Sequence, residues 1–216
     1  MKRSKEILVF GGAYSNFQAT QKLRDIALNL GFSPNRIICT GDVVGYCGQP
    51  QETINLIGDW GVHVIAGNVE LQLAENKDDC GCNFEEDSRC ANFSQTWFPY
   101  AQIHVNQESK DWMRALPTSA KIDFDGIAVG IVHGGLENIS EFIFKSTPPH
   151  TKKRVFETLG VDFVLAGHSG LPFHQKFGED LWVNAGVIGM PANDGENEVW
   201  YAIVDLETKK VEHLSF

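Results

Sequence analysis

The sequence predicts an α/β protein in which two sheets pack face to face with helices outside, a four-layer α/β/β/α sandwich. Two observations support this fold class. Strand-like and helix-like segments alternate as βαβαβ over residues 7–66, which indicates parallel strands joined by right-handed crossovers. From Thr118 onward the pattern changes to short strand-like segments, which we assign to a second sheet. The chain of 216 residues is long enough for a sizeable core, and we expect one domain over 1–216.

The first half of the chain supplies the βαβαβ pattern. Ile7–Phe10 is a short continuous apolar run, as expected for a strand covered on both faces. The segment from about Asn16 to Leu30 carries apolar residues along one helical face, and Gly31 follows it as a stop signal. The unit continues with a strand at Arg36–Cys39, a helix at Gln51–Trp60 and a strand at His63–Ala66.

Residues 69–116 contain no obvious strand. Helical patterns occur at Phe93–Val105 and Glu108–Leu116. Before them, residues 74–92 are acidic, contain three cysteines and nearly lack large apolar side chains. We expect this segment to be an exposed loop.

The remaining segments predict the second sheet and one helix. Lys121–Phe124 and Ile127–His133 flank an Asp125-Gly126 pair, which predicts a hairpin with a tight turn. Further along we expect a helix at about Thr151–Leu159 and strands at Val161–Ala166, Pro172–Phe177, Leu181–Asn184, Val199–Val204 and Val211–Ser215.

Composition and charge exclude several classes of function. The formal net charge of -10 argues against non-specific binding to nucleic acid or to anionic membranes. The N-terminal apolar run has four residues, too few for a signal peptide, and no stretch reaches the length of a membrane span. Five cysteines without a secretory signal fit a reducing compartment, so we expect a cytoplasmic protein.

Four polar residues follow strand-like runs and sit in glycine-containing turns: Asp42 in ICTGD, Asn68 in VIAGN, His133 in GIVHGG and His168 in VLAGH. Strand ends are rigid positions from which side chains can converge on a cleft. A carboxylate, an amide oxygen and two imidazoles suit Mn, Fe or Zn. Taken singly, the aspartate could be a turn residue or a helix cap, and each histidine could be hydrogen-bonded in the core.

The motifs that carry a family resemblance are, in chain order, Gly41-Asp42, Gly67-Asn68-Val69-Glu70, His133-Gly134 and Gly167-His168-Ser169-Gly170. They resemble the calcineurin-like metallophosphoesterase superfamily, and the small bacterial and archaeal phosphodiesterases within it. The resemblance implies the same four-layer sandwich and a binuclear metal site. It implies that Asp42 bridges the two metals, and that Asn68, His133 and His168 complete the ligands of one divalent or trivalent ion, Mn, Fe or Zn.

The resemblance also identifies positions where this chain departs from the family. Gly12, Tyr14 and Gly170 stand where the ligands of the other metal belong, so we expect no second metal. Tyr14, Cys47 or His174 could in principle replace a ligand, although a strand would place His174 roughly 13 Å from Gly170. Restoring Gly12→Asp, Tyr14→His and Gly170→His together should therefore raise activity.

Three further positions concern the substrate and the proton donor. Val69 replaces the family histidine that protonates or stabilises the ester oxygens. Glu70, which orients that histidine in the family, remains as a supporting carboxylate or a helix N-terminal charge, with general base as the alternative. Asn16 survives from the first motif and is a candidate substrate-binding residue.

Two functions follow from this pattern. The first is metal-dependent hydrolysis of a phosphomonoester or phosphodiester from a one-metal site, with weak activity. The two-metal clamp is incomplete, and general acid–base help is typically worth ~10²–10⁴-fold. The alternative is an inactive family member that binds a phosphorylated ligand or acts as a protein-interaction scaffold, as the retromer scaffold subunit does.

The cysteines leave three alternatives open. Cys80, Cys82 and Cys90, with Cys47, could form a four-thiolate zinc or iron–sulfur site, but the usual signature is a pair of CxxC motifs. We favour exposed thiols on an acidic loop. A redox-sensitive lid over the cleft is the third possibility.

Overall fold

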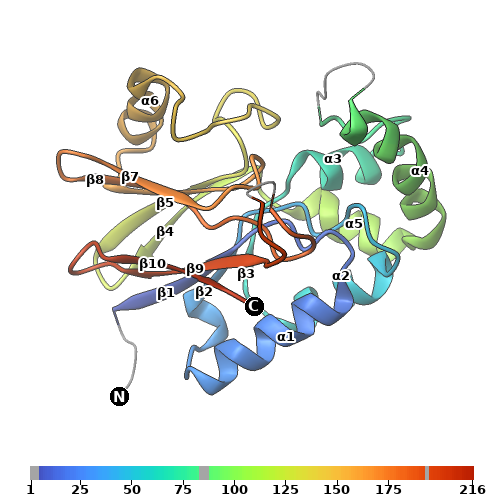
Figure 1. Ribbon diagram of the computed structural model, residues 1–216, viewed down its shortest axis with the longest axis horizontal. Helices are drawn as coiled ribbons and strands as arrows, with labels where there is room; N and C mark the ends of the chain where they lie inside the picture. The colour runs from blue at the N-terminus through green and yellow to red at the C-terminus, as the bar shows by residue number, and fades with distance from the viewer. Residues whose placement is uncertain (1–4, 83–87, 193–194) are drawn as a thin grey trace.

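The structure is a computed structural model that describes residues 5–82, 88–192 and 195–216. Two five-stranded sheets pack face to face, with helices on both outer faces (Figure 1). The first sheet has the strand order β10-β9-β1-β2-β3. Its strands are β1 (Glu6–Phe10), β2 (Ile37–Cys39), β3 (His63–Val64), β9 (Trp200–Asp205) and β10 (Val211–Ser215). Strands β1, β2 and β3 are parallel neighbours, which confirms the predicted βαβαβ unit.

The second sheet has the strand order β4-β5-β6-β8-β7. Its strands are β4 (Ser119–Phe124), β5 (Ile127–Val132), β6 (Phe163–Ala166), β7 (Phe173–Phe177) and β8 (Asp180–Asn184). The predicted hairpin is confirmed as antiparallel β4 and β5. Asp125 and Gly126 both have positive φ, 56° and 88°, as a tight hairpin turn requires.

Helices complete the outer layers. They are α1 (Phe17–Asn29), α2 (Pro50–Trp60), α3 (Asn68–Ala74), α4 (Arg89–His104), α5 (Gln107–Ala115) and α6 (Pro149–Leu159), with a 3₁₀ turn at Pro34–Arg36. In Figure 1, α1 and α2 lie on the outer side of the first sheet and α6 on the outer side of the second, while α3, α4 and α5 gather at one end. Among the helices of the described residues, none has the length and apolar character to span a membrane.

Alternating residues of β1 explain how one strand serves two cores. Ile7 and Val9 face the second sheet, whereas Leu8 and Phe10 face the helices. All four side chains are fully buried, which accounts for the continuous apolar run in the sequence.

The segment after β3 differs from our expectation in two ways. The sequence pattern did not predict α3, and α4 begins at Arg89 because the Ser88 hydroxyl caps it by accepting a hydrogen bond from the Ala91 amide. The expectation of an exposed loop over 74–92 holds at 75–79 but is wrong for Cys80 and Cys82. Both thiols are buried in the core between the first sheet and its helices, and residues 83–87 lie outside the described part.

Candidate metal centre

The four residues predicted to bind metal come together at the ends of parallel strands. Asp42 follows β2, His133 follows β5, His168 follows β6, and Asn68 is the first residue of α3. The Nε2 atom of His133 lies 3.1 Å from Asn68 Oδ1 and 3.1 Å from His168 Nδ1. The same nitrogen lies 3.3 Å from Asp42 Oδ2. Relative exposures are 5% for Asp42, 1% for Asn68, 1% for His133 and 9% for His168.

The hydrogen-bond partners of His133 show that this cluster needs a positive charge. Its Nδ1 atom lies 2.7 Å from the Thr40 carbonyl, which can only accept, so Nδ1 carries a proton. Nε2 then faces a carboxylate oxygen and an amide oxygen. Either a second proton or a metal cation must lie among these acceptors, because buried acceptors facing one another without a cation are unfavourable.

The amide of Asn68 is oriented by contacts on the side away from His133. Its Nδ2 group donates to the Cys80 carbonyl at 2.8 Å and to the Cys82 sulfur at 3.2 Å. Because both amide hydrogens are directed there, Oδ1 is the atom that points into the cluster.

The spacing and the donor types fit a bound metal ion. Ligands about 2.0 Å from a tetrahedral ion are about 3.3 Å apart, close to the separations measured from His133 Nε2. One further oxygen of the cluster, Asp42 Oδ1, is buried and has no hydrogen-bond partner among the described residues. Nitrogen and oxygen donors of this kind suit Mn, Fe or Zn. Among the described residues, Asp42, His133 and His168 are the one group of three or more acidic, cysteine or histidine side chains with this convergence.

Burial and neighbouring charge set the protonation of the cluster. Burial lowers the pKa of His133, but the Asp42 carboxylate, the Thr40 carbonyl and the charge of Glu70 together raise it more, so the pKa lies above its ordinary value. Burial raises the pKa of Asp42, yet the charge of His133 and its hydrogen bond bring it below the usual range. Burial and the charge of His133 lower the pKa of His168 to about 4. His168 is therefore neutral at pH 7, as a ligand must be.

Glu70 lies behind the cluster and joins two of its turns. One carboxylate oxygen accepts hydrogen bonds from the Asp42 and Gly67 amides, both at 2.8 Å, and the other accepts from the Val44 amide at 3.2 Å. Burial and the charge of Asp42 raise the pKa of Glu70 to about 7, against the effect of these amides. With its oxygens engaged by backbone, Glu70 has the contacts of a positioning residue. Its role as a general base finds no support in this geometry.

The region around Gly12, where the family resemblance predicts ligands for a second metal, is packed with apolar and aromatic groups. A Cβ atom on Gly12 would lie 2.4 Å from Val187 Cγ1 and 2.8 Å from the Tyr14 ring. Tyr14 is buried and packs edge-on against Tyr46, with ring centroids 4.8 Å apart. A side chain at position 12 must therefore displace Val187, whereas a Cβ on Gly170 would lie 3.8 Å from Val187 Cγ1, an ordinary contact.

The remaining candidates have other partners. Asn16 caps α1 by accepting from the Ala19 amide at 3.0 Å, and its Nδ2 donates to the Gly189 carbonyl at 2.8 Å. These are the contacts of a helix cap, and substrate binding by Asn16 stays a prediction. His174 does not join the cluster: its Nδ1 lies 3.3 Å from Nε2 of His213. The Cys47 thiol donates to the Gly189 carbonyl.

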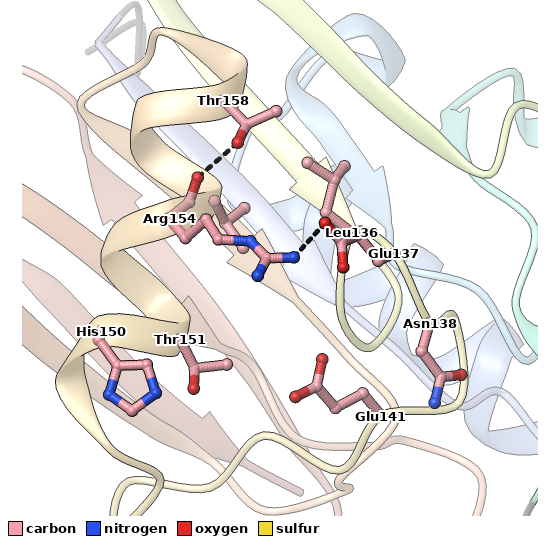
Figure 2. Close-up of a pocket in the computed structure, with 9 residues that line it drawn as sticks. Leu136, Glu137, Asn138, Glu141, His150, Thr151, Arg154 and Thr158 are labelled. Carbon is pink, nitrogen blue, oxygen red and sulfur yellow. Dashed lines mark hydrogen bonds and ion pairs between the residues drawn. The ribbon is translucent and has the colours of Figure 1, made fainter.

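A separate cavity of about 480 Å³ lies between α6 and the loop that follows β5. Figure 2 shows Arg154 of α6 reaching across to Glu137 of that loop, with Glu141 and His150 at the other end of the cavity. None of the four metal-binding candidates lines it. The cavity therefore does not provide a substrate pocket for the cluster.

A four-layer sandwich with a buried carboxylate, amide and imidazole cluster at its strand ends is the arrangement of a metallophosphoesterase. The chain belongs to the calcineurin-like phosphoesterase superfamily, whose domain model matches residues 9–209. It is 25% identical to an uncharacterized protein of Methanocaldococcus jannaschii over 95% of this chain and 85% of the relative.

Two solved structures show the same fold at low sequence identity. The metallophosphoesterase from Sphaerobacter thermophilus has a TM-score of 0.72 and 20% identity, covering 97% of this chain and 87% of that one. Vps29 from Entamoeba histolytica has a TM-score of 0.55 and 18% identity, covering 98% and 99%. The fold is thus found in a protein named for phosphoesterase activity and in one that is not.

Proposed function

We propose that this protein binds one Mn, Fe or Zn ion through Asp42, Asn68, His133 and His168, and hydrolyses phosphomonoesters or phosphodiesters slowly. The observation that carries this proposal is the convergence of acceptor atoms on His133 Nε2 at 3.1–3.3 Å, with a proton already assigned to Nδ1. Membership of the superfamily supports the choice of phosphate esters as substrates.

A metal ion bound here would polarise a phosphoryl oxygen and acidify a bound water. The residues explain why turnover would be slow. Val69 is apolar and buried where the family has a histidine, so it gives no proton to the leaving group. Glu70 is committed to backbone amides. We therefore expect activity mainly on esters with good leaving groups, which need no proton.

Manganese stoichiometry tests the metal site. Metal-stripped protein, reloaded and dialysed, should retain one manganese per chain, and His168→Ala should retain none. Two manganese ions per chain would contradict the one-metal proposal, and none would contradict the site itself.

Hydrolysis is tested on the same preparations. Bis(p-nitrophenyl) phosphate, which has a good leaving group, should be cleaved only by the loaded wild-type protein. Thymidine 5′-monophosphate p-nitrophenyl ester and an alkyl phosphodiester should separate leaving-group dependence from substrate shape. If the protein binds manganese but cleaves none of these esters, the proposed hydrolysis is wrong and the proposed metal site still stands.

The second candidate is a non-catalytic member that uses the fold to bind a phosphorylated ligand or a protein. Its specific support is the closure of the site: all four ligands have exposures of 9% or less, and Tyr14 and Val187 occupy the region beside them. Four protein ligands in a closed shell are typical of structural metal sites, whereas catalytic sites keep a position open. Cleavage of bis(p-nitrophenyl) phosphate distinguishes the two, because a closed metal shell would retain manganese and cleave no ester.

A further inference from the structure

Two histidines meet where an edge of one sheet faces an edge of the other. His174 lies on β7 and His213 on β10, which are edge strands of the second and the first sheet. Nδ1 of His174 lies 3.3 Å from Nε2 of His213. The rings are nearly parallel, at 15°, and their centroids are 5.5 Å apart, so they approach by their nitrogen-bearing edges. One nitrogen can donate to the other, and this hydrogen bond joins the two sheets.

The surroundings of the pair decide which nitrogen donates. His213 Nδ1 is buried and has no hydrogen-bond partner among the described residues, whereas His174 is an exposed side chain. A buried N–H group without an acceptor is less favourable than a bare nitrogen at the same place. We therefore assign the proton of His213 to Nε2, which donates to His174 Nδ1, and the proton of His174 to its own Nε2.

This arrangement has no favourable place for a further proton. On His213 the proton would occupy Nδ1, where it would be buried without an acceptor. On His174 it would occupy Nδ1, the nitrogen that accepts the hydrogen bond, and two N–H groups would then face each other. Either protonation breaks the contact or leaves a buried donor unsatisfied.

The groups around the pair do not compensate a positive charge. The charged side chains that act on His174 are Lys145, from the loop before α6, and Lys176 of β7, and both are positive. The cross-strand neighbours of the two histidines are the apolar Val183 and Ala202. Among the described residues, no carboxylate acts on the pKa of either histidine.

We propose that the His174–His213 pair is a proton-sensitive latch, which links the edges of the two sheets at neutral pH and releases them in weak acid. This inference is independent of the proposed metal site and of hydrolysis. Lys209, in the turn between β9 and β10, contacts Glu179, in the turn between β7 and β8. The two hairpins are therefore also joined at their tips, and the latch controls the link between their strands.

The direction of the pH effect follows from the protons that each state binds. Burial and the charge of His174 lower the pKa of His213 to about 4. Burial, Lys145 and Lys176 lower the pKa of His174. A histidine of the unfolded chain titrates at about 6.5, so the native pair binds fewer protons between these values. The stability that the pair contributes is complete above about pH 6.5 and is lost as the pH falls toward 4.

A double-mutant cycle at two pH values tests the latch. Wild type, His174→Ala, His213→Ala and the double variant are unfolded in urea with a chelator present, so that metal binding does not enter. At pH 7 the two histidines should be coupled by a factor of about 2–10 in the unfolding equilibrium constant. At pH 5 this coupling should be absent or reversed. Equal coupling at both pH values would overturn the proposal, and so would an absence of coupling at pH 7.

A conservative variant separates titration from packing. The amide of His213→Gln can donate to neutral His174 or, turned over, accept from protonated His174, so its coupling to His174 should persist at pH 5. His150→Gln, the same change at an exposed histidine of α6, should show no coupling to His174 at either pH. Loss of the His213→Gln coupling at pH 5 would contradict the latch.

Nitrogen NMR of the wild-type protein provides a measurement that needs no variant. The spectra should show His213 with its proton on Nε2 at pH 7, and still neutral at pH 5. A proton on Nδ1 at pH 7, or a His213 ring already charged at pH 5, would overturn the assignment of the pair as a latch even if His213→Ala fails to fold.

Discussion

Glu70 illustrates how a residue outside the ligand set can hold a site together. Its carboxylate accepts hydrogen bonds from backbone amides in the turns that carry Asp42 and Asn68. These two turns come from different parts of the chain. The sequence placed Glu70 as a supporting carboxylate through the family motif. The groups that Glu70 supports are backbone amides, and a pattern of side chains in the sequence does not reveal contacts with backbone amides.

Glu70→Gln should destabilise the protein and loosen the metal site. The NH2 group of the glutamine would face backbone N–H groups, and a donor cannot accept a hydrogen bond from another donor. The N–H groups left without an acceptor cost about 1–3 kcal/mol of folding free energy each when buried. Manganese affinity should fall about 10–100-fold. Urea unfolding and calorimetric titration measure the two effects. Glu52→Gln, the same change at an exposed position of α2, should leave both unchanged, and equal effects in the two variants would refute the assignment.

Protonation of His133 should compete with metal binding. The pKa of His133 lies above its ordinary value, and a metal ion must replace the proton on Nε2. Below that pKa, manganese affinity should fall about tenfold for each unit of pH, and above it the affinity should level off. In metal-free protein the raised pKa contributes stability that is present at low pH and is lost as pH rises through the folded-state pKa.

Titration calorimetry in buffers of different ionisation enthalpy measures this competition. One proton should be released per manganese bound at pH 6, and fewer at higher pH. Proton release that does not change with pH would show that His133 is not the group displaced.

At the scale of elements, the ends of the parallel strands account for what the sequence could predict. Asp42, His133 and His168 each follow a short apolar run, so their strand-end positions were predictable, and the fold brings them together. The close packing of Val187 against Gly12 was not predictable from the sequence. Val187 lies after β8, far from Gly12 in the chain, and its approach to Gly12 depends on how the strands are arranged in space.

The prediction for the segment after β3 was partly wrong, because its structure also depends on contacts with distant parts of the chain. Helix α3 spans only Asn68–Ala74, too short for a clear periodic pattern, and Glu70 stabilises its first turn from within the motif. Cys80 and Cys82 sit in a polar stretch, yet they are buried because the Asn68 amide and the Ser140 hydroxyl satisfy the polar backbone of their turn. Burial here is a property of the tertiary contacts.

Restoration of the missing ligands should now fail unless space is made for them. Gly12→Asp, Tyr14→His and Gly170→His together should still bind one manganese per chain, because Val187 Cγ1 would lie 2.4 Å from the new Cβ at position 12. Adding Val187→Ala should allow a second manganese and raise cleavage of bis(p-nitrophenyl) phosphate. Val187→Ala alone controls for loosening of the core. Two manganese ions in the triple variant would show that the loop around Gly12 moves more easily than its packing indicates.

At the scale of the whole molecule, a metal that joins four strand-end turns should stabilise the fold against unfolding. The predicted ligands come from both sheets and from α3, so an ion bound there would link elements that are distant in the sequence. Manganese at one hundred times its dissociation constant would add about 2.7 kcal/mol to the free energy of unfolding. For a chain of 216 residues, this corresponds to a rise in Tm of about 5–10 °C.

Thermal unfolding of metal-stripped protein, with and without manganese, measures this stabilisation. His168→Ala should abolish the rise in Tm, because it removes one ligand. His174→Ala should keep it, because His174 pairs with His213 outside the cluster. A rise that survives in His168→Ala would mean that manganese binds elsewhere on this acidic protein. A rise lost in both variants would mean that the histidine pair between β7 and β10 contributes to metal-linked stability.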